Sequence, residues 1–149
     1  MKHLLPILAL FITSNLLAQS DKEVQWTFAA KKIADDTYEI HMTARVNSDW
    51  HIYSQNAGDG PYATNFTFTK NPLINYDGKV KEAGKLKKVF EKSFDSEVRY
   101  YEDVVNFVQV VKLKGKAKTN VAGKVEFMVC NDSRCLPPAE VNFKINIGG

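Results

Sequence analysis

The sequence predicts an all-β domain in which two sheets pack as a sandwich. Three observations predict it. Apolar and polar residues alternate along several short segments, turn-forming residues separate these segments, and no stretch has the periodicity of an amphipathic helix. Alternation with period two places one face of a strand on a core and the other in water. About seven to nine such strands are typical of an immunoglobulin-like two-sheet β-sandwich, and a small closed barrel is the alternative.

The expected strands can be followed in order along the chain. The first contains Val24, Trp26 and Phe28, each followed by a polar or small neighbour, and the next segments alternate in the same way. The segment at residues 98–113 is rich in Val, Tyr and Phe, and is long enough to be one bent strand or two strands. The expected strands lie at residues 24–28, 38–46, 66–68, 98–113, 124–129 and 140–147. The expected turns lie at residues 34–36, 58–61, 71–72, 77–78 and 115.

The N-terminal segment differs from the rest of the chain. Lys2 and His3 precede an almost wholly apolar run that ends at Leu17 and is followed by a small residue. This layout predicts a signal peptide over residues 1–18 and a mature domain over residues 19–149. The run is shorter than the roughly 20 residues that span a bilayer as a helix, which argues against a membrane anchor. We therefore expect an exported chain whose mature part does not cross a membrane.

Composition and charge exclude several classes of function. Hydrophobic residues make up 44% of the 149 residues and charged residues 25%, as in ordinary globular domains. Removing residues 1–18 takes away one lysine and no acid, which lowers the formal net charge from +3 to +2. This charge is too small to indicate nucleic-acid binding, and the basic cluster at residues 79–88 is typical of a solvated face.

The two cysteines, Cys130 and Cys135, carry the most informative chemistry. An exported chain meets an oxidising environment, so the pair is expected to form a disulfide. The four residues between them fit a loop between neighbouring strands, and Pro137 and Pro138 leave the second sulfur near a loop edge. Such a bridge either stabilises the fold, by only about 2 kcal/mol for so short a loop, or is open to reduction. The pattern leaves both interpretations open.

No catalytic motif of another kind is present. The sequence lacks a Ser/His/Asp set, a phosphate-binding glycine loop and a paired-carboxylate motif. Cys130, Cys135, Met128, His51 and His41 include soft ligands suited to copper, but no His-x-His or Met-rich run accompanies them. We therefore expect neither a metal nor a cofactor.

Three blocks of the sequence resemble a known family. They read W-H-I-Y-S at residues 50–54 with G-P at 60–61, R-Y-Y-E-D at 99–103, and F-M-V-C-N-D-S-R-C-L-P-P at 127–138. In this order they resemble the N-terminal periplasmic domain of the thiol:disulfide interchange protein DsbD. The resemblance covers about residues 24–147 and implies an immunoglobulin-like periplasmic domain without a cofactor.

The resemblance also implies a function and a site. A thioredoxin-like donor would reduce the cysteine pair, and the domain would act as a protein-disulfide reductase module on disulfide-bonded periplasmic proteins. Cys135 would form the mixed disulfide and Cys130 would resolve it. His51 and Tyr53 would line the cysteine pocket, and Phe94 would cap the sulfurs.

The sequence departs from this family in ways that keep a second function open. DsbD itself has five residues between its cysteines, where this chain has four, and a tyrosine at the position of His51. The membrane and thioredoxin-like domains of DsbD are not in this sequence, so we expect a stand-alone module that needs separate partners. The rival function is a non-catalytic immunoglobulin-like binding domain with a structural disulfide.

Neighbouring residues are expected to tune or shield the cysteines. Arg134 would favour the Cys135 thiolate and Asp132 would oppose it, while His51 either exchanges a proton with a thiol or is merely packed. The segment at residues 89–96 breaks the strand pattern yet carries Phe90 and Phe94. Either Phe94 covers the disulfide, or both rings turn into the sandwich core.

Overall fold

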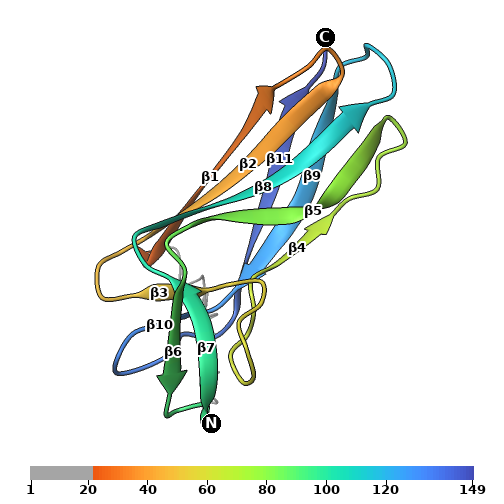
Figure 1. The fold of residues 1–149 in the computed structure, drawn as a ribbon. Coiled ribbons are helices and arrows are strands. Elements are labelled where there is room, and N and C mark those ends of the chain that lie inside the picture. Colours follow the sequence, from red (N-terminus) through yellow and green to blue (C-terminus); the bar gives the residue numbers. More distant parts are fainter. Residues whose placement is uncertain (1–21) are drawn as a thin grey trace, which may run out of the picture.

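The computed structural model describes residues 22–149 and consists mainly of strands (Figure 1). Eleven strands occur in this part of the chain: β1 (Val24–Lys32), β2 (Thr37–Val46), β3 (His51–Tyr53), β4 (Asn65–Phe68), β5 (Ile74–Gly84), β6 (Lys87–Glu91), β7 (Ser96–Tyr101), β8 (Val104–Leu113), β9 (Thr119–Phe127), β10 (Val129–Cys130) and β11 (Ala139–Ile147). The signal peptide expected at residues 1–18 lies outside the described residues. Within residues 22–149, no helix has the length and apolar character needed to cross a membrane.

Two antiparallel sheets form the sandwich. One has the strand order β1-β2-β8-β5 and the other the order β11-β9-β4. Alternate side chains of each sheet enter one shared core, in which Ile40 and Met42 of β2 and Val121 and Val125 of β9 are fully buried. Each sheet ends in edge strands, so neither closes on itself. The predicted two-sheet sandwich is therefore confirmed, and the closed barrel is wrong.

A third sheet, of order β10-β3-β7-β6, lies at one end of the sandwich (Figure 1, lower end). Its strands extend those of the sandwich, since β3 follows β2, β7 precedes β8 and β10 follows β9. Alternation divides its side chains between two faces. Ile52, Val129 and Tyr101 join the main core. On the other face, which we call the site face, a separate small cluster contains Tyr53, Val98, Met128 and Cys130.

The expected turn at residues 77–78 is wrong, because Asp77 and Gly78 lie inside β5. The pairing of β5 with β8 shifts register between Asp77 and Lys81, and Gly78 accommodates this bulge with a φ of 70°. The buried side chain of Gln109 faces the irregular segment. Its Nε2 donates to the carbonyl oxygens of Asp77 at 3.1 Å and of Val110 at 2.9 Å.

We expect Gln109→Leu to lower the free energy of unfolding by about 1 kcal/mol, because the part-buried carbonyls of Asp77 and Val110 would lose a donor. Urea unfolding followed by circular dichroism measures this change. Gln25→Leu, on an exposed site of β1, is the matched control and should stay within about 0.5 kcal/mol of wild type. An equal loss in both variants would show that Gln109 does not support the bulge.

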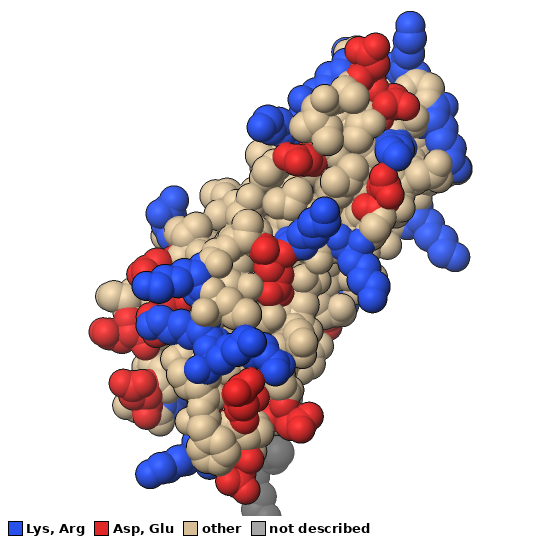
Figure 2. All heavy atoms as spheres, viewed as in Figure 1, with Lys and Arg blue, Asp and Glu red and all other residues tan. Residues whose placement is uncertain are grey.

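The basic cluster at residues 79–88 lies on exposed parts of β5 and β6, as expected for a solvated face. Figure 2 shows acidic side chains interleaved with basic ones over the visible face. Lys87 forms an ion pair with Glu102, and Lys112 contacts Asp77 at 2.9 Å. Acidic side chains therefore lie among the basic ones on this surface (Figure 2).

Candidate functional site

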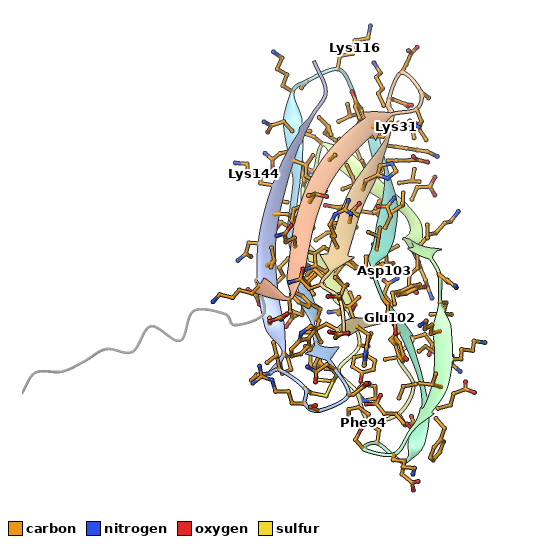
Figure 3. The ribbon with its side chains drawn as sticks, turned by 90° about the vertical axis from the view of Figure 1, so that its left-hand side faces the viewer. Lys31, Phe94, Glu102, Asp103, Lys116 and Lys144 are labelled. Atoms are coloured by element: carbon orange, nitrogen blue, oxygen red, sulfur yellow. A yellow bond between two sulfur atoms is a disulfide. The ribbon has the colours of Figure 1, made fainter. Side chains whose placement is uncertain are left out.

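The two cysteines form a disulfide at the end of the third sheet (Figure 3). Cys130 ends β10, where it pairs with His51 of β3, and it is completely buried. Cys135 lies opposite Cys130 as an isolated bridge residue outside the named strands, and it is exposed. The disulfide therefore has one accessible half and one inaccessible half.

The loop between the cysteines is held by local hydrogen bonds. The backbone N–H of Asn131 donates to the carbonyl of Arg134, and that of Leu136 donates to the carbonyl of Val129, both at 2.9 Å. The side-chain oxygen of Asn131 accepts from the backbone N–H groups of Ser133 and Arg134, also at 2.9 Å. This Asx-type arrangement is a local turn that asparagine favours. It lets the short loop reverse direction and present Cys135 at the surface.

His51 is the cross-strand neighbour of Cys130. Side chains directly paired across antiparallel strands share a face, with Cβ atoms about 4.5–5.5 Å apart. The imidazole of His51 is buried and stacks on Tyr100, with ring centroids 4.1 Å apart. Its Nε2 lies 3.2 Å from the hydroxyl of Tyr53. The two expected pocket residues, His51 and Tyr53, are thus on the same face as Cys130.

A hydrogen-bonded network extends from His51 to β6. The fully buried Tyr53 donates its hydroxyl hydrogen to the Glu91 carboxylate at 3.0 Å. Burial, reinforced by Glu91, raises the pKa of Tyr53 far above its usual range, so the hydroxyl keeps its proton. Burial lowers the pKa of His51, while Glu91, Glu102 and Asp132 act in the opposite direction. The dominant burial effect favours a neutral imidazole.

A recess of about 450 Å³ opens beside Cys135. Its lining combines the site face of the third sheet with the disulfide loop, and both charge signs are present. The lining residues are His51, Val89, Glu91, Lys92, Ser93, Tyr100, Asn131, Asp132, Ser133, Arg134 and Cys135. Cys130 is not among them. A group that enters the recess therefore meets the sulfur-bearing residue Cys135 and not Cys130.

The segment at residues 89–96 is the end of a β-hairpin, in which a turn joins β6 to β7. Phe94 lies in this turn, at the same end of the molecule as the disulfide (Figure 3). Its half-buried ring meets Tyr53 edge to face, with centroids 6.2 Å apart, and packs on the cluster that contains Cys130. The alternative that both phenylalanines enter the sandwich core is wrong for Phe90, which is 64% exposed.

The close packing of Phe94 requires a glycine opposite it. Gly60 has a φ of 105°, which side chains rarely adopt, and a Cβ there would lie 2.6 Å from the Phe94 ring. Phe94 does not line the recess beside Cys135. The structure therefore places Phe94 over Tyr53, next to the buried half of the site.

The remaining residues considered from the sequence are dispersed. The guanidinium of Arg134 lies 5.7 Å from the centroid of the Trp50 ring, and Met128 packs in the small cluster with Cys130. His41 lies in β2, where it contacts Glu39 and Asn106. Within residues 22–149, no group of three or more His, Cys, Asp or Glu side chains is arranged to hold a metal ion.

Three polar residues of the site were not singled out from the sequence. Tyr100 and Glu102 lie in the R-Y-Y-E-D block, whose alternation places both on the site face with His51. Glu91 lies in the hairpin segment, between the aromatic residues Phe90 and Phe94. No local pattern indicates Glu91, because its partner Tyr53 is 38 positions away in the sequence.

Fold and site together define a class of protein: an immunoglobulin-like β-sandwich domain that carries one half-accessible disulfide on an end sheet. The chain belongs to the family of the N-terminal domain of the thiol:disulfide interchange protein DsbD, whose family model matches residues 16–146. Comparison with curated proteins gives no match.

Solved structures show the same fold at low sequence identity. The DsbD N-terminal domain of Neisseria meningitidis in its reduced form has a TM-score of 0.60 and 16% identity, over 89% of this chain and 92% of that one. The N-terminal periplasmic domain of ScsB from Proteus mirabilis has a TM-score of 0.61 and 15% identity, over 89% of this chain and 49% of that one. This chain thus spans about half of the ScsB chain.

A third structure contains a partner. In the complex between the DsbD and PilB N-terminal domains of Neisseria meningitidis, the matched chain has a TM-score of 0.53 and 14% identity, over 87% of this chain and 88% of that one. These likenesses confirm the immunoglobulin-like fold predicted from the sequence.

Proposed function

We propose that this domain is a periplasmic thiol–disulfide interchange module. It accepts electrons from a thioredoxin-like donor and passes them to disulfide-bonded periplasmic proteins through Cys130 and Cys135. The observation that carries this proposal is the asymmetry of the disulfide, in which Cys135 is exposed at a recess and Cys130 is buried. Family membership supports it, as does the complex formed by the Neisseria DsbD domain with the PilB domain.

Each half of the cycle exchanges one disulfide for another. A donor thiolate attacks Sγ of Cys135, and the electron pair of the broken bond leaves on Cys130. The donor's second thiolate then attacks the donor's first sulfur in the mixed disulfide and releases the Cys135 thiolate. The domain has then gained two electrons. Toward a client the order reverses: the Cys135 thiolate attacks the client disulfide, and Cys130 then attacks Cys135 and releases the client thiol.

The N-terminal sequence supports the periplasmic part of the proposal. Residues 1–18 have the layout of a signal peptide, and cleavage there would leave the domain at residues 19–149 as the mature chain. The related ScsB domain is periplasmic. The intact mass of the exported protein tests this step, and retention of Met1 in a membrane fraction would contradict it.

The rival function, an immunoglobulin-like binding domain with a structural disulfide, differs in the reduction potential of the pair. We expect a potential above roughly −300 mV, as in oxidoreductases, because the bridge closes a short loop and Cys135 is exposed. Equilibration in glutathione or dithiothreitol buffers, followed by mass spectrometry of alkylated samples, measures it. A potential well below that value, with no reduction by a thioredoxin-like protein, would identify the bridge as structural and contradict the proposed function.

A further inference from the structure

The hydrogen bond between Tyr53 and Glu91 determines where His51 carries its proton. The Tyr53 hydroxyl has one hydrogen, and it is donated to the Glu91 carboxylate. Toward His51, 3.2 Å away, the hydroxyl oxygen can then only accept. Nε2 of His51 must therefore carry a hydrogen, and in the neutral ring the lone pair is on Nδ1. Tyr53 and Glu91 thus leave His51 with a free basic nitrogen.

This basic ring neighbours the buried cysteine of the pair. When the pair is reduced, Cys130 is a buried thiol, and burial raises the pKa of a thiol. Thiol–disulfide exchange requires the thiolate, so Cys130 needs a proton acceptor. His51, which is paired directly with Cys130 across β3 and β10, is placed to be that acceptor.

The surroundings of His51 suit a ring that is neutral at rest and charged for a short time. Glu91 and Lys87 face it from β6, Tyr100 and Glu102 from β7 and its end, Tyr53 from β3, and Asp132 from the disulfide loop. Three of these groups are carboxylates and one is a lysine, which is itself paired with Glu102. The net negative field would stabilise the imidazolium that forms on proton transfer.

We propose that His51 is the general base that activates Cys130 in the resolving step, with Tyr53 and Glu91 as its positioning residues. The inference rests on the proposed function. In the mixed disulfide, the Cys130 proton moves to Nδ1 of His51 and Sγ of Cys130 bonds to Sγ of Cys135. The bond from Cys135 to the client sulfur breaks, and its electron pair leaves on that sulfur. In the reverse direction, the imidazolium returns the proton to the departing Cys130.

Two-phase kinetics with the chromogenic disulfide DTNB test this assignment. The reduced domain releases one coloured thiolate when Cys135 attacks and a second when Cys130 resolves. In His51→Gln we expect a second phase slowed about 100-fold at neutral pH, far more than any change in the first phase. In wild type, the second phase should rise with pH through a His51 pKa that burial holds below its usual value, and then level off. In the variant it should keep rising up to the pKa of the thiol.

Two further variants separate proton transfer from packing. His41→Gln, in β2 of the main sandwich, is the matched control and should react as wild type does. Tyr53→Phe keeps the ring but removes the hydroxyl, so its second phase should be slower than wild type and its pH inflection should move. If His51→Gln fails to fold, nitrogen NMR of the wild-type imidazole shows which ring nitrogen carries the hydrogen. A hydrogen on Nδ1 would overturn the proposal.

Different results would contradict the role of His51 and the interchange function of the domain. His51→Gln and His41→Gln could show equal second-phase rates and pH profiles while the wild-type reduction potential is that of an oxidoreductase. This result would exclude His51 as the base but would not contradict the interchange function. If the wild-type disulfide has a reduction potential typical of structural bridges, both the interchange function and the role of His51 would be abandoned.

Discussion

The Cys130→Ser variant is expected to form a stable mixed disulfide, through Cys135, with a thioredoxin-like protein that keeps only its first cysteine, activated beforehand as a mixed disulfide with DTNB. Neither protein then holds a second thiol that could resolve the adduct, and the exposed Cys135 remains open to the partner. The Cys135→Ser variant should give about tenfold less adduct or even less, because attack depends on access to the sulfur and Cys130 is completely buried. Non-reducing electrophoresis and intact mass measure the two adducts.

The two single variants control for each other. Both lose the disulfide, which for so short a loop is worth about 2 kcal/mol, so both should remain folded to a similar extent. Circular dichroism checks this before the adducts are compared. Equal trapping by the two variants would show that Cys130 becomes accessible on reduction, and the assignment of Cys135 as the attacked residue would be abandoned.

Phe94→Ala is expected to speed the reaction of the reduced pair with a small disulfide reagent by about tenfold, which corresponds to an activation free energy lower by about 1.4 kcal/mol. The Phe94 ring covers Tyr53 beside the buried half of the site, so its removal opens a path to the small cluster that contains Cys130. Because the ring is only half-buried, the free energy of unfolding should fall by about 1–2 kcal/mol. A fully buried phenylalanine would cost about 3–5 kcal/mol.

Phe90→Ala is the matched control, since Phe90 lies in the same hairpin and is 64% exposed. Its reaction rate should equal that of wild type, and its stability should change by less than about 0.5 kcal/mol. Stopped-flow absorbance and urea unfolding provide the two measurements. Unchanged thiol reactivity in Phe94→Ala, together with a loss of about 3–5 kcal/mol, would make Phe94 a core residue and end its role as a cap.

The sandwich could be predicted because its long strands display their own periodicity. Tyr38, Ile40 and Met42 alternate with polar neighbours, and all three are buried in the structure. The third sheet could not be predicted in this way. β3 and β10 have three and two residues, too few to show alternation, and they are strands only because neighbouring strands supply hydrogen bonds. The bulge in β5 could not be predicted either, because an Asp-Gly pair is locally typical of a turn.

The sequence by itself determined the all-β class, the two-sheet sandwich, and a short loop suited to a disulfide between Cys130 and Cys135, because each depends on residues close together in the chain. The sequence placed Cys135 near a loop edge, but only the tertiary structure decided that Cys130 is buried, because β10 pairs with β3. The tertiary structure also brought Glu91, Tyr53 and His51 together in one hydrogen-bonded network. That network joins three side chains from two strands of one sheet, and sheet pairing between distant segments leaves no trace in local periodicity.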